Sequence, residues 1–162
     1  MDTEAIRQTY RPDQIHILFV GESPPDGGKF FYVESQMTTH MANVIASVFS
    51  KSFKSAEAFL KFFKDERCYL DDLCLTPVNG LTEYERAREV NASIEPYANR
   101  IKKYKPQYII AVLKKIEKQV RQSAHIAQFD DARVFAVPFA GNGQQGRFKK
   151  DLTLILTRIC EK

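Results

Sequence analysis

Apolar residues gather in four short runs along the chain, and longer amphipathic stretches separate these runs. Within the runs, the segments ILFV, YIIAVL and VFAV are almost continuously apolar. Such continuity is typical of strands that are covered on both faces, as in a parallel sheet. We therefore expect strands at Ile15–Val20, Cys68–Leu73, Gln107–Leu113 and Arg133–Phe139.

The amphipathic stretches predict helices, because their apolar residues recur every three to four positions. Thr82 and Glu85 form a T-x-x-E capping box, which predicts the start of a long helix that Pro106 ends. The other helices are expected at about residues 41–48, 56–66, 114–128 and 148–159.

Strands and helices alternate along the whole chain, which favours an α/β fold with right-handed crossovers. We predict a single domain over residues 1–162, built as a three-layer α/β/α sandwich around a four-stranded parallel sheet. Ligands of such sheets bind beyond the carboxyl ends of the strands. Here those ends carry the polar, Gly- and Pro-rich loops GESPPDGG, DDLCLTPVNG and PFAGNGQQGR, so we expect the functional site there.

Composition narrows the class of protein. The chain has 162 residues, no signal-peptide pattern and no apolar run of membrane-spanning length, so we expect a cytoplasmic protein without a membrane partner. Its three cysteines form no C-x-x-C pair and its three histidines are scattered. We therefore expect no disulfide framework, metal site or cofactor.

Charge is unevenly distributed. Residues 1–100 hold 11 Lys and Arg against 15 Asp and Glu, whereas residues 101–162 hold 13 against 5, which gives net charges of −4 and +8. The basic final third suits a phosphate-rich partner such as a nucleic acid or a nucleotide. The alternative is that these lysines belong to ordinary solvated helix faces.

The loop after the first strand offers two candidate catalytic carboxylates, Glu22 and Asp26. Pro24 and Pro25 stiffen this loop, and a stiff loop can aim a carboxylate without an ordering cost during the reaction. Phe30 and Phe31 follow and can form a stacking wall for a flat ligand. The alternative for these two rings is a place in the hydrophobic core.

The loop after the fourth strand opens directly into the last helix. Free N–H groups at a helix start attract anions, and glycines let a ligand approach the backbone closely. It is not a P-loop, since the G-x-x-x-x-G-K-[ST] pattern is absent. The residues expected to bind phosphate or nucleic acid are Gly141, Asn142, Gly143, Gln144, Gln145, Arg147, Lys149 and Lys150.

From about Gln14 to the C-terminus, the order of these motifs resembles the uracil-DNA glycosylase superfamily. The first strand ends in a G-x-x-P motif, here Gly21-Glu22-Ser23-Pro24, which is closest to the form of the iron–sulfur branch; GGKFF then matches its glycine and stacking phenylalanine. YLDDLCLTPVNG is similar to the family's second motif, with Asp72 near the usual Asn, and KPQYIIAVL resembles its P-x-x-I-x-x-L run.

The chain also departs from that pattern. Ser23 stands where most members have a water-positioning Asp or Asn, Val137 stands where they have the His of the last loop, and the iron–sulfur cysteines are missing.

The resemblance implies an enzyme that cleaves the N-glycosidic bond of a damaged or deaminated base in DNA, after flipping the base out of the helix. It implies water positioning by Glu22 or Asp26. The base-binding residues that it implies are Ser23, Pro24, Phe30, Phe31 and Asp72. DNA is the first expected partner, with RNA or a free nucleotide as alternatives.

Two other classes of function are open on the sequence. One is a module that binds a nucleobase or nucleic acid on the same fold without cleaving it. The absence of the last-loop His and the presence of Ser23 at the water-positioning place favour this class. The other is a serine hydrolase using Ser23, which would need a late histidine with an acid three residues before it. No histidine follows His125, and no acid stands at that offset.

Overall fold

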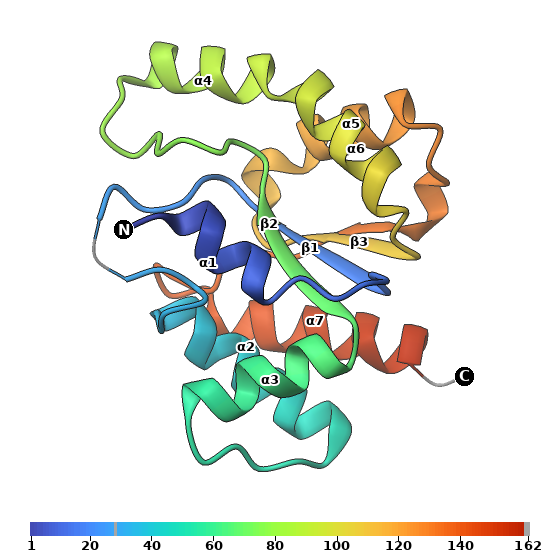
Figure 1. Cartoon of the computed structure of the whole chain (residues 1–162). Helices are drawn as coiled ribbons and strands as arrows, with labels where there is room; N and C mark the ends of the chain where they lie inside the picture. The colour runs from blue at the N-terminus through green and yellow to red at the C-terminus, as the bar shows by residue number, and fades with distance from the viewer. Residues whose placement is uncertain (28, 161–162) are drawn as a thin grey trace.

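A computed structural model describes residues 1–27 and 29–160 of the chain; Gly28 of the GGKFF motif and residues 161–162 of the predicted domain lie outside this description. Its centre is a four-stranded parallel sheet in the order β2-β1-β3-β4 (Figure 1). The strands are β1 (Ile17–Gly21), β2 (Cys68–Asp72), β3 (Tyr108–Ala111) and β4 (Val134–Ala136). Each strand overlaps one of the four predicted runs, all of which are longer than the strand, and β1 extends one residue past its run, to Gly21.

Helices cover both faces of the sheet, so the predicted three-layer α/β/α sandwich is confirmed (Figure 1). One layer holds α2 (Gln36–Phe49), α3 (Ala56–Asp65) and α7 (Gln145–Cys160), and α2 packs against α7. The other holds α4 (Glu83–Ala92), α5 (Ile94–Tyr104) and α6 (Glu117–Ile126), and α5 packs against α6. Two 3-10 turns, Lys114–Ile116 and Asp131–Arg133, precede α6 and β4.

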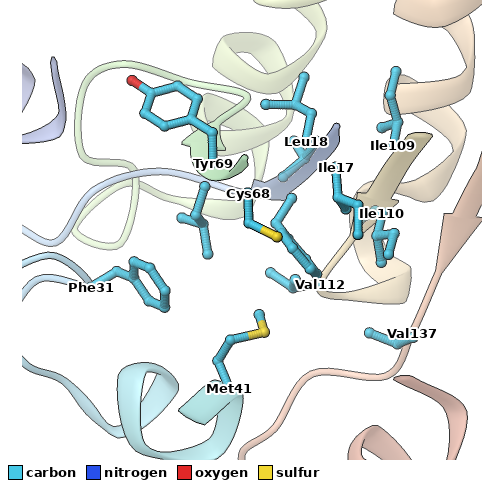
Figure 2. Packing of buried hydrophobic residues seen from close by; sticks show 14 of the residues in the cluster. Ile17, Leu18, Phe31, Met41, Cys68, Tyr69, Ile109, Ile110, Val112 and Val137 are labelled. Carbon is cyan, nitrogen blue, oxygen red and sulfur yellow. The ribbon is translucent and has the colours of Figure 1, made fainter. Parts of the chain in front are cut away.

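The core runs through the sheet, because its central strands are buried on both faces. Every residue of β1 is buried, and so are Ile109, Ile110 and Ala111 of β3. Met41 from α2 and Phe31 from the loop after β1 pack against the same cluster (Figure 2). Burying a side chain of this size contributes about 1.5–3 kcal/mol, so the core holds the strand ends, and the loops they carry, in a fixed arrangement.

The prediction of one long helix from Thr82 to Pro106 is wrong. The capping box of Thr82 and Glu85 is present, but the helix ends at Ala92 and a second one starts at Ile94. Pro96 explains the break, since its ring has no N–H and would clash with the carbonyl of residue 92 in a continuous helix. Ser93 at the junction donates a hydrogen bond from its hydroxyl to the Glu89 carbonyl at 2.8 Å.

A short helix that the hydrophobic pattern did not predict, α1 (Thr3–Thr9), lies beside β2 (Figure 1). Asp2 caps it, accepting a hydrogen bond from the Ala5 N–H at 3.0 Å. The helix carries Arg7, which is 1% exposed. An N-terminal segment with a fully buried arginine is therefore part of the folded unit.

The strand order places β1 at the centre, with β2 on one side and β3 on the other. The connections run in opposite directions from this point, which opens a crevice beyond the carboxyl ends of β1 and β3. Among the described helices, none is long and apolar enough to cross a membrane.

Candidate functional site

A cavity of about 1310 Å³ opens at the carboxyl edge of the sheet. The loops after all four strands line it, together with the first turn of α2, one side chain of α4 and the start of α7. Most of its wall is apolar, and eight charged side chains also line it. This combination is typical of small-molecule sites at the switch point of a parallel sheet.

Glu22 is the first residue after β1, and it lines this cavity. Its side chain is only 9% exposed, and Arg86 of α4 holds both carboxylate oxygens: Arg86 Nε donates to Oε2 at 2.9 Å and Nη2 donates to Oε1. Lys115 Nζ lies 3.8 Å from Oε2. The ion pair raises the pKa of Arg86, mainly through its hydrogen bond to Glu22. The carboxylate is fixed in direction, yet each oxygen keeps a lone pair for a water molecule.

The other polar residues of this loop differ in position. Ser23 lines the cavity, and its hydroxyl accepts a hydrogen bond from the Val78 N–H at 3.3 Å, which ties the loop after β1 to the loop after β2. Pro24 also lines it. Asp26 is exposed and lies outside the cavity wall. Of the two acids predicted from the sequence, the fold brings only Glu22 into the cavity.

The aromatic residues of the same loop lie mainly in the hydrophobic core. Phe30 and Phe31 are only 2% and 5% exposed, although both line the cavity. The hydroxyl of Tyr32 donates to the Leu70 carbonyl at 2.9 Å and accepts from the Leu70 N–H at 2.6 Å, so it pairs with the free edge of β2. Burial raises the pKa of Tyr32 well above its usual value. The alternative interpretation, that Phe30 and Phe31 belong to the hydrophobic core, therefore agrees with their burial.

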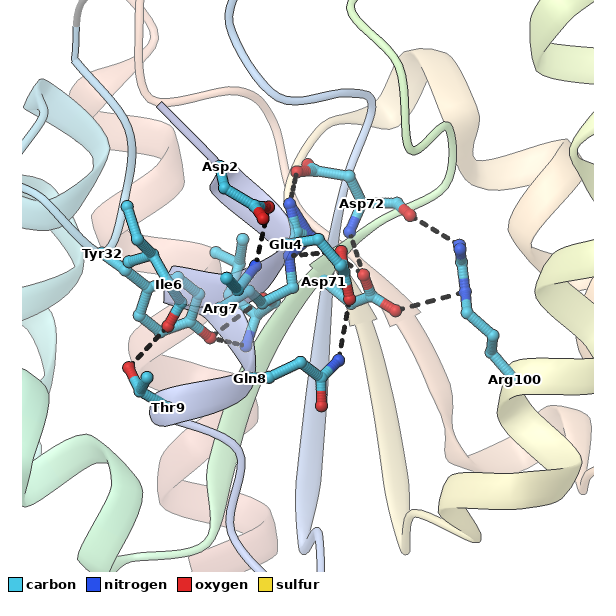
Figure 3. A network of polar contacts seen from close by, with 12 residues as sticks. Asp2, Glu4, Ile6, Arg7, Gln8, Thr9, Tyr32, Asp71, Asp72 and Arg100 are labelled. Carbon is cyan, nitrogen blue, oxygen red and sulfur yellow. Dashed lines mark hydrogen bonds and ion pairs between the residues drawn. The ribbon is translucent and has the colours of Figure 1, made fainter.

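At the end of β2, two carboxylates share one arginine. Arg7 Nη1 donates to Asp71 Oδ1 at 3.0 Å, and Arg7 Nη2 donates to Asp72 Oδ2 at 2.9 Å (Figure 3). Arg100 of α5 approaches from the opposite side, with Nε 3.4 Å from Asp71 Oδ2 and Nη2 donating to the Asp72 carbonyl at 2.7 Å. Two positive and two negative groups are thus balanced within the protein, which is what burial of charge requires.

Only one of these two carboxylates reaches the cavity. Asp72 lines it, whereas Asp71 is 1% exposed and does not. Gly21 pairs with Asp72 in the parallel register, and a Cβ at Gly21 would lie 2.4 Å from Asp72 Oδ1. The first motif therefore needs glycine at position 21, because any side chain there would displace the Asp72 carboxylate.

Burial governs the protonation of both acids. It raises the pKa of Asp72 to about 7, although Arg7 acts in the opposite direction. It also raises the pKa of Asp71, against the influence of Arg100 and Arg7. Asp72 is therefore an acid at the cavity wall that changes protonation near neutral pH, a property that is concentrated at functional sites.

The loop after β4 contributes the most exposed aromatic ring of the site. Phe139 is 47% exposed and lines the cavity, and its ring lies against Gly141, where a Cβ would be 2.6 Å from a ring carbon. Phe139 was not among the predicted site residues. Its signal was a phenylalanine directly after a proline at a strand end, outside any amphipathic stripe.

The predicted phosphate-binding loop divides into two groups. Asn142, Gln144 and Arg147 line the cavity. Gly143, with φ of 79°, turns the chain toward α7. The remaining predicted residues lie outside the cavity wall: Gly141, Gln145, Lys149 and Lys150.

Positive side chains outnumber acids among the residues that line the cavity. Lys29, Lys114 and Lys115 line it along with Arg86 and Arg147. The acids that line it are Glu22, Asp72 and Asp151. The lysines after β3 and the arginine on α4 were not predicted as site residues, since nothing in the local sequence distinguishes them from lysines and arginines on a solvated face.

The described part of the chain lacks the residue arrangements that metal binding and serine hydrolysis would need. No group of three or more His, Cys, Asp or Glu residues there is placed to hold a metal ion. No described histidine lines the cavity, so Ser23 has no histidine partner in it. The three cysteines are free thiols.

Comparison with known protein families finds no family model that matches this chain. No curated protein matches it either.

Proposed function

We propose that this protein hydrolyses the N-glycosidic bond of a nucleobase-containing substrate in the cavity at the carboxyl edge of the sheet. One observation carries the proposal: two carboxylates, Glu22 and Asp72, stand at neighbouring strand ends and both line an apolar cavity. The cavity is large enough for a nucleobase, and the positive side chains that line it suit the phosphates of a nucleic acid or nucleotide. The order of motifs, which resembles the uracil-DNA glycosylase superfamily, supports the same activity.

In this mechanism, Glu22 orients a water molecule toward the anomeric carbon of the sugar. Arg86 fixes the direction of the carboxylate, so little ordering is needed when substrate binds. The bond from the anomeric carbon to the base nitrogen breaks, and the base leaves with the bonding electrons. The water oxygen bonds to the anomeric carbon, and one water proton replaces the sugar on the base. Asp26 has no part in this mechanism, because it lies outside the cavity wall.

The test uses single- and double-stranded oligonucleotides that carry one uracil, hypoxanthine, xanthine or alkylated adenine, with strand breakage after alkali as the readout. Glu22→Gln should reduce turnover by about 100-fold or more, the range for a positioned acid–base group. Asp26→Asn is the matched control, because it changes an acid of the same loop outside the cavity, and it should retain turnover. Cleavage that survives Glu22→Gln would contradict the role of Glu22.

A second candidate is a non-catalytic module that binds a nucleobase or nucleic acid. The observation that favours it is the full engagement of Glu22 by Arg86, with Lys115 nearby. Such a module would bind the same oligonucleotides without breaking them. The logarithm of its association constant should fall linearly with log[salt] if phosphates are contacted. Cleavage by the native protein excludes it.

A further inference from the structure

We propose that the cavity carries a second activity: Lys115 acts as a nucleophile that forms an imine with the sugar aldehyde of an abasic site and then breaks the DNA strand. An abasic site is the sugar that remains in the strand after a base has been lost. The proposal rests on the proposed function only in that the cavity receives the sugar of a nucleic acid. It adds an amine nucleophile to a site whose first activity uses water.

Lys115 lies in a turn that the sheet holds next to the end of β1. The Val112 N–H donates to the Val20 carbonyl at 2.9 Å, so the segment after β3 leaves the sheet beside the segment after β1. Lys115 follows in the 3-10 turn Lys114–Ile116, and the buried side chain of Ile116 anchors that turn in the core. The Lys115 side chain lines the cavity and is 57% exposed. Its backbone is therefore fixed, whereas its amine can reach a substrate.

The amine of Lys115 has a proton acceptor beside it. Its Nζ lies 3.8 Å from Glu22 Oε2, which is longer than a hydrogen bond, and Arg86 already donates to both oxygens of that carboxylate. Two cations therefore share one anion, and the lysine is held more weakly than the arginine. Only the lysine can lose its proton, because a guanidinium stays charged in proteins. Since an amine attacks a carbonyl in its neutral form, Glu22 is placed to activate Lys115.

The other polar residues that line the cavity fit this role less well. Among the described residues, Lys115 is the cavity lysine that is paired with a carboxylate of the same cavity, whereas Lys114 faces Glu117 of α6 at 3.9 Å. No described cysteine or histidine lines the cavity. A nucleophile that acts there with a neighbouring base is therefore Lys115.

In the first step, Glu22 takes a proton from Lys115, and Nζ bonds to the aldehyde carbon of the ring-opened sugar. Glu22 returns the proton to the hydroxyl group formed there, which leaves as water, so a protonated imine links the protein to the sugar. In the second step, Glu22 removes a proton from the neighbouring carbon and passes it to solvent. That electron pair forms a carbon–carbon double bond, and the 3′ phosphate leaves with the electrons of its bond to the sugar. Water then hydrolyses the imine and releases Lys115.

The test uses single- and double-stranded oligonucleotides with one preformed abasic site, so it does not require the protein to remove a base. The whole chain is incubated with them and with sodium borohydride, which reduces an imine to a stable amine linkage. We expect a covalent protein–DNA adduct on a denaturing gel, and peptide mapping by mass spectrometry should place the sugar on Lys115. Without borohydride, the strand should break at the site without added alkali.

Lys115→Arg keeps the positive charge but offers no amine that can be deprotonated, so it should abolish the adduct. The exposed position should tolerate this change, which urea denaturation checks. Lys118→Arg is the matched control, because it makes the same change at an exposed lysine outside the cavity wall, and it should retain the adduct. Glu22→Gln should slow strand breakage at the abasic site by about 100-fold or more, the range for a positioned acid–base group.

The outcomes separate this proposal from the proposed function. No adduct, an adduct mapped to another lysine, or an adduct that survives Lys115→Arg would overturn it. An adduct on Lys115 with strand breakage, but without base release from any oligonucleotide, supports the role of Lys115 and rejects the hydrolase. Base release that leaves the strand intact until alkali is added, with no trapped adduct, rejects only the role of Lys115.

Discussion

Two arginine–carboxylate clusters border the same cavity, and they differ mainly in burial. Arg7 is 1% exposed and is enclosed with Asp71 and Asp72, whereas Arg86 has a side chain that is 30% exposed where it meets Glu22. Removing one partner of a buried pair leaves a charge without compensation, but an exposed pair is screened by solvent. The Arg7 cluster therefore supports the fold and holds the Asp72 carboxylate in place, while the Arg86 pair mainly directs Glu22.

The largest expected effect comes from Arg7→Met, which leaves Asp71 and Asp72 without their shared partner. We expect the free energy of unfolding to fall by about 3–5 kcal/mol, measured by urea denaturation. Arg11→Met is the control: Arg11 lies over the Tyr104 ring at 5.5 Å, and its loss should cost about 1 kcal/mol or less. A loss below that of Arg11→Met would show that the buried cluster does not stabilise the fold.

Gly21→Ala perturbs the buried cluster through the Asp72 carboxylate. The added Cβ would lie 2.4 Å from Asp72 Oδ1, so the carboxylate must move away from Arg7. We expect a loss of about 1–3 kcal/mol in the free energy of unfolding, together with weaker nucleoside binding. Gly80→Ala is matched, since a Cβ there meets no atom within 4 Å. Equal stability of the two variants would mean that Asp72 adapts without cost.

The pH dependence of stability distinguishes the clusters further. Because the pKa of Asp72 is raised to about 7, the folded protein binds that proton more tightly than the unfolded chain does. The contribution of Asp72 to the free energy of unfolding should therefore fall as pH rises from about 4 to about 7, and it should be constant above that range. Denaturation across this range should show a shallower fall for Asp72→Asn than for the native protein; parallel curves would contradict the assignment.

The smallest effect is expected for the partly buried pair of Arg86 and Glu22, because Arg86 stays open to solvent and Lys115 also lies near Glu22. Arg86→Ala should lower the free energy of unfolding by about 1 kcal/mol or less, and the difference should shrink at high salt. Arg88→Ala, which changes an exposed arginine of the same helix, is the reference. A salt-independent loss above about 2 kcal/mol would place Arg86 with Arg7 as a residue that supports the fold.

The sequence was informative where function depends on strand ends. Parallel strands bring their carboxyl ends to one edge, so the hydrophobic pattern alone assigns the loops containing Glu22, Asp72 and Asn142 to a shared site. The hydrophobic pattern does not show the helix break at Ser93, because the residues after the capping box at Thr82 and the apolar positions after Ile94 fit a single helical period. Pro96 is the only local signal of the break that the sequence contains there.

Other parts of the site depend on tertiary contacts that no local pattern encodes. Arg7 and Arg86 reach carboxylates 64 positions away, and each looks locally like an ordinary helix residue. The burial of Phe30 and Phe31 was equally undetermined, since consecutive aromatic residues in a loop have no periodicity that assigns a face. Exposed Phe139 was missed because it closes the predicted strand Arg133–Phe139, although the proline before it marks the end of a strand.

The contact between Arg7 and Asp71 also affects the order in which the protein folds. It closes a loop of 64 positions, and closing long loops is entropically costly until other contacts shorten the effective distance. The β1–β2 pairing makes such contacts, so α1 should dock only after that pairing has formed. The Asp72 carboxylate is then fixed late in folding, because an intermediate with a complete sheet would still lack its hydrogen bond from Arg7.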